Sequence, residues 1–190
     1  MPHCYEKTIV EIKKEYTTFL INTLTPNIFN GLKSIYLMAL KKNKEYREQE
    51  NNDVKVPSVL RIFQTYLKDI PEWSNQIIEQ ETERLRATSK CSDWFDDLIK
   101  AVIKSHIVLL TFTKNELIKQ KTHEDFKTDE LIHKIYIECS HQFFNYPELF
   151  WHKYDALETK KNQREILLII KDSIQEAIKK LLPMKSILKE

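Results

Sequence analysis

The sequence predicts an all-α protein, a single-domain bundle of about seven helices that spans residues 1–190. Three observations support this fold class. Gly31 is the single glycine in the chain, whereas tight hairpins and phosphate-binding loops depend on glycine for positive φ values. Apolar residues recur at steps of three and four, the periodicity of amphipathic helices. The composition, 42% hydrophobic and 31% charged, is typical of a folded domain with a core.

The N-terminal part of the chain predicts two helices. The first carries an apolar stripe made of Tyr5, Ile9, Ile12, Tyr16, Phe19 and Leu20. The segment "TLTPN" is expected to break it, with Thr25 as a cap and Pro26 at the first position of a second helix. Gly31 costs that second helix about 1 kcal/mol relative to alanine. We therefore expect Gly31 to mark a close contact with a neighbouring helix.

A polar segment near residues 41–55 follows, and "KKNKEYREQENND" within it has one aromatic and no aliphatic residue. It predicts an exposed loop or a frayed helix end, and it is the best candidate for disorder. Pro57 opens a short third helix that reaches Ile70. The break "DIPEWS" precedes a fourth helix, whose predicted inward residues are Trp73, Ile77, Ile78 and Leu85.

The stretch "CSDWFDDLIKAVIKSHIVLL" predicts a mostly buried central helix near residues 93–113. At 100° per residue its polar strip covers only about a third of the circumference. His106 falls in the middle of the apolar face and Asp97 falls opposite it, so the two cannot ligate one metal ion. We interpret His106 as a hydrogen-bonded core histidine, and the acidic start of the helix as a complement to its dipole.

Two further helices complete the predicted bundle. Thr128 is expected to cap a helix that runs to Phe143 before "NYPELF" interrupts it. The last helix is predicted to begin at Asn162, which forms an asparagine variant of the capping box with Glu165. Pro183 is expected to end it.

Charge, cysteine spacing and hydropathy restrict the function. Thirty Lys and Arg against 28 Asp and Glu leave a formal net charge of +2, which is too balanced to indicate a nucleic-acid binder by itself. Three cysteines without a CxxC string fit a reducing compartment. No apolar run is long enough to span a bilayer, and "MPHCYEKT" has no signal region, so an intracellular protein is expected.

Motifs that carry enzyme chemistry are missing from the sequence. It contains no GxGxxG, no phosphate-loop lysine, no HExxH and no GxSxG string. The sequence therefore predicts no catalytic residue, no bound cofactor and no metal site.

An aromatic cluster after the sixth predicted helix is the first candidate site. The segment "FFNYPELFWHKY" is too rich in rings, and too irregular around Pro147, to bury all of them on one helical face. We predict a contact surface for a protein partner or a second copy of the chain, formed by Tyr146, Phe150, Trp151 and Tyr154. The alternative is that these rings close the open end of the bundle and pack its last two helices together.

Basic residues form the second candidate site. Lys41, Lys42 and Lys44 follow the second predicted helix, and Lys179 and Lys180 lie near the end of the last one. A patch of this kind would bind nucleic-acid phosphates, which makes a nucleic-acid-associated accessory factor the alternative function. Solvated helix faces more commonly account for such charges.

Two ExxH strings, Glu130–His133 and Glu138–His141, raise the possibility of a metal-dependent helical enzyme. In helical di-iron proteins such a string is needed on each of two facing helices, together with a glutamate from each of two others. Here both strings lie on one predicted helix, so this is the least favoured interpretation.

The central block resembles an uncharacterised all-helical family encoded by nucleocytoplasmic large DNA viruses, the giant viruses of protists and their relatives. The pieces that carry the resemblance are "FQTYLKDIPEW", "IIEQETERL", "DDLIKAVIKSHI" and "SIQEAIKKLLPMKSILKE". The resemblance implies no active site. It implies a component of the virion or of the viral factory in the host cytoplasm. We therefore predict a non-enzymatic assembly or interaction protein.

Overall fold

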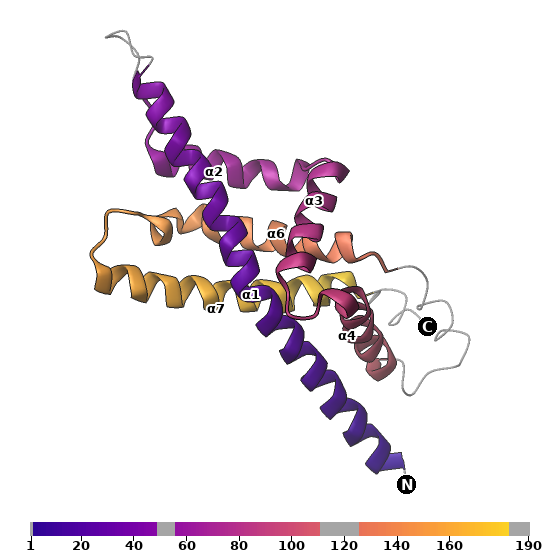
Figure 1. The fold of residues 1–190 in the computed structure, drawn as a ribbon. Helices are drawn as coiled ribbons and strands as arrows, with labels where there is room; N and C mark the ends of the chain where they lie inside the picture. The colour runs from indigo at the N-terminus through magenta and orange to yellow at the C-terminus, as the bar shows by residue number, and fades with distance from the viewer. Residues whose placement is uncertain (1, 49–55, 111–125, 183–190) are drawn as a thin grey trace.

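The computed structural model describes residues 2–48, 56–110 and 126–182 (Figure 1). In these ranges the chain forms six α-helices, three short 3₁₀ helices and no strand. The α-helices are α1 (Pro2–Glu48), α2 (Val59–Asp69), α3 (Asn75–Thr88), α4 (Phe95–Leu110), α6 (Thr128–Asn145) and α7 (Ala156–Leu181). The 3₁₀ helices are η1 (Ile70–Glu72), η2 (Ser92–Trp94) and η3 (Pro147–Phe150). The predicted all-α class is confirmed, and the predicted number of helices is close.

The N-terminal region forms one helix of 47 residues, so the predicted break at Pro26 is wrong. Pro26 removes one backbone N–H from the helix, but polar side chains beside it bond to carbonyls of the preceding turn. Thr25 Oγ1 donates to the Ile21 carbonyl at 2.6 Å, and Asn27 Nδ2 donates to the Thr23 carbonyl at 3.1 Å. Two flanking residues are fully buried, Leu24 and Ile28. Packing of this turn outweighs the helix-breaking cost of proline, about 3 kcal/mol.

The long helix α1 organises the bundle. It crosses the other helices diagonally and packs against α2, α3, α4 and α7 (Figure 1). On the other side α6 packs against α2, α3 and α7, and all six α-helices contribute to one continuous hydrophobic core. The N-terminal end of α1 projects beyond the bundle (Figure 1). None of the helices in the described ranges is long and apolar enough to cross a membrane.

The mostly buried helix predicted near residues 93–113 is α4, preceded by η2; residues 111–113 lie outside the described ranges. Its buried stripe consists of Phe95, Leu98, Ile99, Val102, Ile103, His106 and Ile107. α4 packs mainly on α1 and also touches α6. The central position in the bundle is therefore not taken by α4, because α1 and α6 each pack against four other α-helices.

The polar segment predicted near residues 41–55 begins as helix, because α1 continues to Glu48; residues 49–55 lie outside the described ranges. Asn43 is buried, and its Nδ2 donates to the Pro57 carbonyl at 2.8 Å. Lys42 pairs with Glu45 on the same helix. The described part of this segment is therefore an ordered helical end, stabilised by a local ion pair and one buried amide without aliphatic residues.

The start of the last helix differs from the prediction. Asp155, not Asn162, is the N-cap of α7, and its carboxylate accepts a hydrogen bond from the Glu158 backbone N–H at 2.8 Å. Asn162 is buried within the helix. Both Asp155-x-x-Glu158 and Asn162-x-x-Glu165 satisfy the capping pattern. The first one prevails because no glycine or proline between them stops a helix.

Gly31 lies where α1, α3 and α6 meet, and the predicted close contact is confirmed. A Cβ on Gly31 would overlap the Tyr136 hydroxyl and lie 2.9 Å from Glu81 Oε1. The buried Tyr136 hydroxyl donates to the Glu81 carboxylate, and Arg84 donates two hydrogen bonds to the same carboxylate at 2.6 and 2.8 Å. Arg84 also donates to the Asn27 carbonyl of α1 at 2.9 Å. We call Glu81, Arg84 and Tyr136 the polar cluster.

Burial is the main electrostatic influence on Tyr136 in this cluster. It raises the pKa of the Tyr136 hydroxyl well above its usual value, and the Glu81 charge raises that pKa further. The hydroxyl therefore stays protonated and donates to Glu81. The polar cluster thus joins three helices through side chains that satisfy one another at the edge of the core.

Candidate functional site

Three residues of the apolar stripe of the first predicted helix are exposed, although Leu20 at its end is buried. Ile12, Tyr16 and Phe19 retain 42%, 43% and 44% of their accessible surface. Positions 5, 9, 12, 16 and 19 alternate in steps of four and three, which is the seven-residue repeat of a helix that packs against another helix. An amphipathic helix in a bundle ordinarily buries such a stripe. In a single chain this part of α1 therefore presents an apolar repeat to solvent.

Two residues of this stripe, Tyr16 and Phe19, lie on one wall of a groove of about 380 Å³, and helix α4 with the turn before it forms the other wall. The Phe19 ring stacks on Trp94 with centroids 5.3 Å apart and an interplanar angle of 28°. Trp94 itself is 46% exposed. We call this feature the α1–α4 groove, and its lining residues are Glu15, Tyr16, Phe19, Trp94, Asp97, Leu98 and Ala101. Exposed aromatic rings with two carboxylates beside them are suited to protein contacts.

The aromatic residues predicted as a partner surface divide between core and surface. Phe150 is buried, because the 3₁₀ turn that begins at Pro147 turns it inward. Its ring contacts four others, those of Phe29, Tyr36, Phe63 and Phe143. Trp151 is partly buried against the core, while Tyr146 and Tyr154 remain 52% and 38% exposed. Phe150 therefore closes the bundle, as the alternative expected, and only the two tyrosines are freely accessible.

The five lysines predicted as a basic patch do not form one surface. Three of them, Lys41, Lys42 and Lys44, lie at the C-terminal end of α1. By contrast, Lys179 lines a cavity together with Lys13, and Lys13 lies toward the N-terminal end of α1. At 1.5 Å per residue the helix from Lys13 to Lys44 is about 46 Å long. The nucleic-acid alternative rested on one basic patch, and these lysines do not form one.

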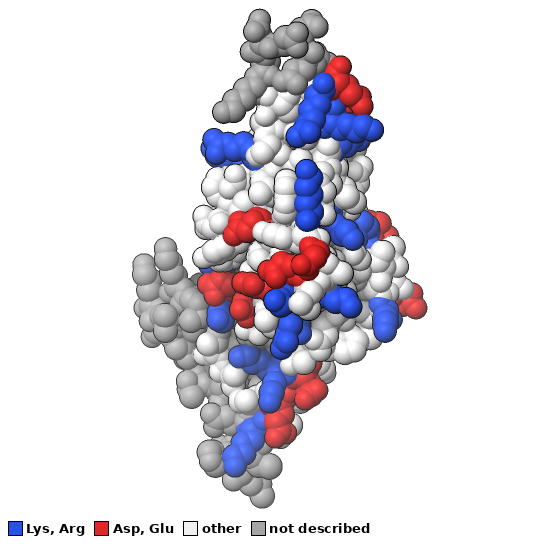
Figure 2. Space-filling view, turned by 90° about the vertical axis from the view of Figure 1, so that its left-hand side faces the viewer, with Lys and Arg blue, Asp and Glu red and all other residues white. Residues whose placement is uncertain are grey.

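Ion pairs also occupy several of these lysines. Lys42 pairs with Glu45, Lys44 with Glu48 and Lys180 with Glu138. On the face drawn in Figure 2, basic and acidic side chains are interspersed. This distribution is typical of solvated helix faces rather than of a continuous phosphate-binding surface.

One residue of each ExxH string takes part in helix packing, while Glu130 and His141 are exposed. His133 Nε2 donates to the Ile70 carbonyl at 2.9 Å, and the His133 ring stacks on Trp73. Glu138 is buried and accepts a hydrogen bond from Lys180 at 2.7 Å. Both strings lie on α6. Among residues 2–48, 56–110 and 126–182, no three His, Cys, Asp or Glu side chains converge to hold a metal ion.

His106 is a hydrogen-bonded core histidine, as predicted. It is 9% exposed, and its Nδ1 lies 2.9 Å from the Val102 carbonyl. A carbonyl only accepts, so Nδ1 carries the proton in this bond. Burial lowers the pKa of His106, and the Lys13 ammonium group of α1 lowers that pKa further.

We expect this environment to make stability depend on pH. Below about pH 6.5 the His106 side chain binds a proton more readily in the unfolded chain than in the folded protein. The free energy of unfolding should therefore fall as the pH drops. His106→Gln should weaken that dependence. Urea denaturation of both proteins at about pH 7.5 and about pH 5.5 measures the difference. Equal losses of stability in the two proteins would contradict the expectation.

The α1–α4 groove was not predicted from the sequence. An apolar stripe indicates that a helix face packs against another helix, but it does not show whether that helix belongs to the same chain. Two signals could have indicated the groove: the strict seven-residue repeat, and Trp94 immediately beside the acidic start of α4.

A protein-family model described as "Family of unknown function (DUF5764)" matches residues 6–151. The match therefore includes every residue of the α1–α4 groove and of the polar cluster. No curated protein and no solved structure matches the chain.

Proposed function

We propose that this chain, which belongs to the DUF5764 family, is a non-enzymatic assembly protein that self-associates through the α1–α4 groove. One observation carries the proposal: Ile12, Tyr16 and Phe19 continue a seven-residue repeat and are exposed. Such a repeat is buried by a helix with matching spacing. A second copy of this chain supplies that helix.

The surroundings of the repeat support a contact between two copies. The N-terminal end of α1 projects from the bundle, so another molecule can approach it (Figure 1). Exposed charges of both signs flank the repeat: the bases are Lys7 and Lys14, and the acids are Glu11 and Glu15. Two copies can therefore place acids beside bases around a central row of apolar side chains.

The test is the mass of the protein in solution. Ile12→Lys combined with Tyr16→Lys puts two charges into the repeat at positions that a single chain leaves exposed. We expect the wild-type protein to run above its single-chain mass of 22.8 kDa in multi-angle light scattering. The double variant should dissociate at least about 100-fold more readily, about 2.7 kcal/mol, with an unchanged helical circular dichroism signal.

A matched control is available on the same helix. Leu37 and Met38 are 52% and 55% exposed and lie outside the repeat. Leu37→Lys with Met38→Lys adds the same charges to α1 and should leave the mass unchanged. A wild-type protein that stays at the single-chain mass at all concentrations, or equal dissociation of the two double variants, would rule out self-association through the groove.

We further propose that the assembled protein is a component of a virion or of a viral factory in the host cytoplasm. The support is the resemblance of "FQTYLKDIPEW" and "DDLIKAVIKSHI" to proteins of giant DNA viruses. Quantitative mass spectrometry of purified virions and of fractionated infected cells tests this. Absence of the protein from both fractions would remove the proposal without affecting self-association.

A further inference from the structure

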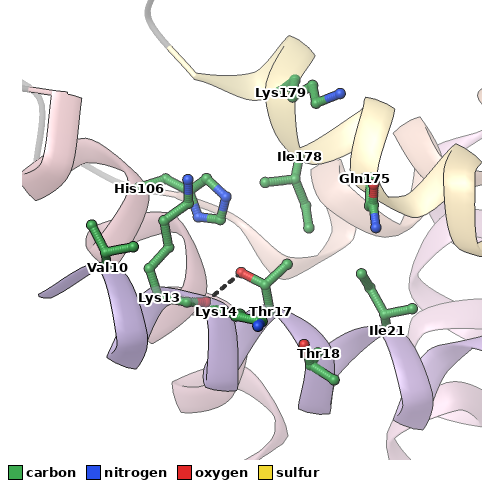
Figure 3. Close-up of a pocket in the computed structure, with 10 residues that line it drawn as sticks. All are labelled: Val10, Lys13, Lys14, Thr17, Thr18, Ile21, His106, Gln175, Ile178 and Lys179. Atoms are coloured by element: carbon green, nitrogen blue, oxygen red, sulfur yellow. Dashed lines mark hydrogen bonds between the residues drawn. The ribbon is translucent and has the colours of Figure 1, made fainter. Parts of the chain in front are cut away.

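A second cavity, of about 430 Å³, lies where α1, α4 and α7 meet (Figure 3). This volume falls in the range of small-molecule sites, about 300–1,000 Å³. Its apolar part is formed by Val10 and Ile21 from α1 and Ile178 from α7. None of its ten lining residues is acidic. We call it the three-helix cavity.

Positive charge from two helices surrounds this cavity. Lys13 and Lys14 come from α1 and Lys179 comes from α7. Among the described residues, no ion pair involves Lys13 or Lys14. Lys179 pairs with Glu176 at 3.7 Å, but the Lys179 side chain is 66% exposed, and an exposed pair of this kind is weak and easily exchanged. The cavity therefore has an excess of positive charge.

Hydrogen-bonding groups stand among these cations. The hydroxyls of Thr17 and Thr18 and the amide of Gln175 line the cavity. Thr17 Oγ1 donates to the Lys13 carbonyl at 2.7 Å, which fixes the orientation of the hydroxyl (Figure 3). Lys13 extends from α1 toward His106 of α4, and both residues line the cavity (Figure 3). Because the Thr17 hydroxyl gives its proton to the Lys13 carbonyl, the donors beside the lysines that suit a phosphate are the Thr18 hydroxyl and the Gln175 amide.

We propose that the three-helix cavity binds a small phosphorylated molecule with an apolar or aromatic part. Lys13, Lys14 and Lys179 contact its phosphate groups. Ile21 and Ile178 pack against its apolar or aromatic part, and the Gln175 amide forms a hydrogen bond with a polar substituent of the ligand. A small ligand fits better than a nucleic-acid strand, because the cavity lies between three helices and the lysines at the far end of α1 are about 46 Å away.

Isothermal titration of the full chain with ATP and with sodium pyrophosphate tests the proposal, at constant ionic strength set with sodium chloride. We expect saturable binding of ATP. Lys13→Gln combined with Lys179→Gln should raise the dissociation constant at least about tenfold, which corresponds to about 1.4 kcal/mol. Lys14→Gln, at an exposed position, should raise it about threefold. A lower affinity for pyrophosphate than for ATP would show that the apolar part contributes.

Two controls distinguish binding in the three-helix cavity from binding elsewhere on the chain. Lys41→Gln with Lys44→Gln removes the same charge at the far end of α1 and should change the dissociation constant less than about twofold. Ile12→Lys with Tyr16→Lys should keep ATP binding, so a failure of self-association and a failure of ligand binding are distinguishable. A thymidine oligonucleotide is titrated in parallel to test for a strand-binding surface.

Three results would overturn the proposal. The first is no saturable heat with either ATP or pyrophosphate. The second is an unchanged dissociation constant in the folded Lys13→Gln, Lys179→Gln protein. The third is tighter binding of the oligonucleotide than of ATP, with a loss in the Lys41→Gln, Lys44→Gln protein. That result would place the phosphate-binding surface at the other end of α1.

Discussion

Gly31→Ala is expected to lower the free energy of unfolding by about 1–3 kcal/mol, although alanine is the better helix former by about 1 kcal/mol. The added Cβ would overlap the Tyr136 hydroxyl and lie 2.9 Å from a Glu81 carboxylate oxygen. Both groups are held by hydrogen bonds to one another, so neither moves without loss. Urea denaturation of the two proteins measures the change.

Tyr136→Phe provides the second arm of this experiment. It removes the hydroxyl that an alanine side chain would meet, so it should cost less in the Gly31→Ala protein than in the wild type. The double-mutant cycle should therefore show coupling of about 1 kcal/mol or more. Additive effects, or an alanine protein more stable than the wild type, would mean that α1 and α6 adjust to the extra methyl group.

Glu81→Ala is expected to destabilise the protein by about 3 kcal/mol. This value is at the lower end of the cost of breaking a buried ion pair, because Arg84 keeps some access to water. The Glu81 side chain is 16% exposed and that of Arg84 is 34% exposed. Removing the carboxylate leaves the Arg84 guanidinium without its counter-charge and the buried Tyr136 hydroxyl without its acceptor.

The same helix supplies a matched control for this substitution. Glu83 also pairs with an arginine three residues further on, Arg86, but the Glu83 side chain is 65% exposed. Glu83→Ala should therefore cost less than about 1 kcal/mol. Chemical denaturation of both variants gives the comparison. Similar losses in the two proteins would show that the polar cluster contributes no more than an ordinary surface pair.

Local patterns in the sequence were sufficient for several predictions. The single glycine and the spacing of apolar residues indicated an all-α fold, and the position of His106 on the α4 wheel indicated burial. Gly31 was expected at a helix contact because a glycine inside a helix is otherwise unfavourable. These properties depend on neighbours within one or two turns of the same helix.

Other features depend on what packs from elsewhere in the chain. Pro26 is a helix breaker by itself, but Leu24 and Ile28 beside it are buried in the core, and that burial comes from other helices. Phe150 belonged to an irregular aromatic segment, and only the fold turns it toward Phe63 and Phe143. The exposure of Ile12 and Tyr16 could not be predicted either, because it results from the absence of a covering helix in the described chain.

The continuity of α1 through Pro26 has a mechanical consequence. At 1.5 Å per residue its 47 residues form a rod about 70 Å long. The α1–α4 groove is near one end of this rod, and α2 packs along the part toward the other end. Two molecules joined at their grooves would hold their bundles at a fixed distance and angle, since Arg84 clamps the rod to α3 at the Asn27 carbonyl just beyond the proline. The continuous helix would then fix the orientation of the two bundles in such a pair.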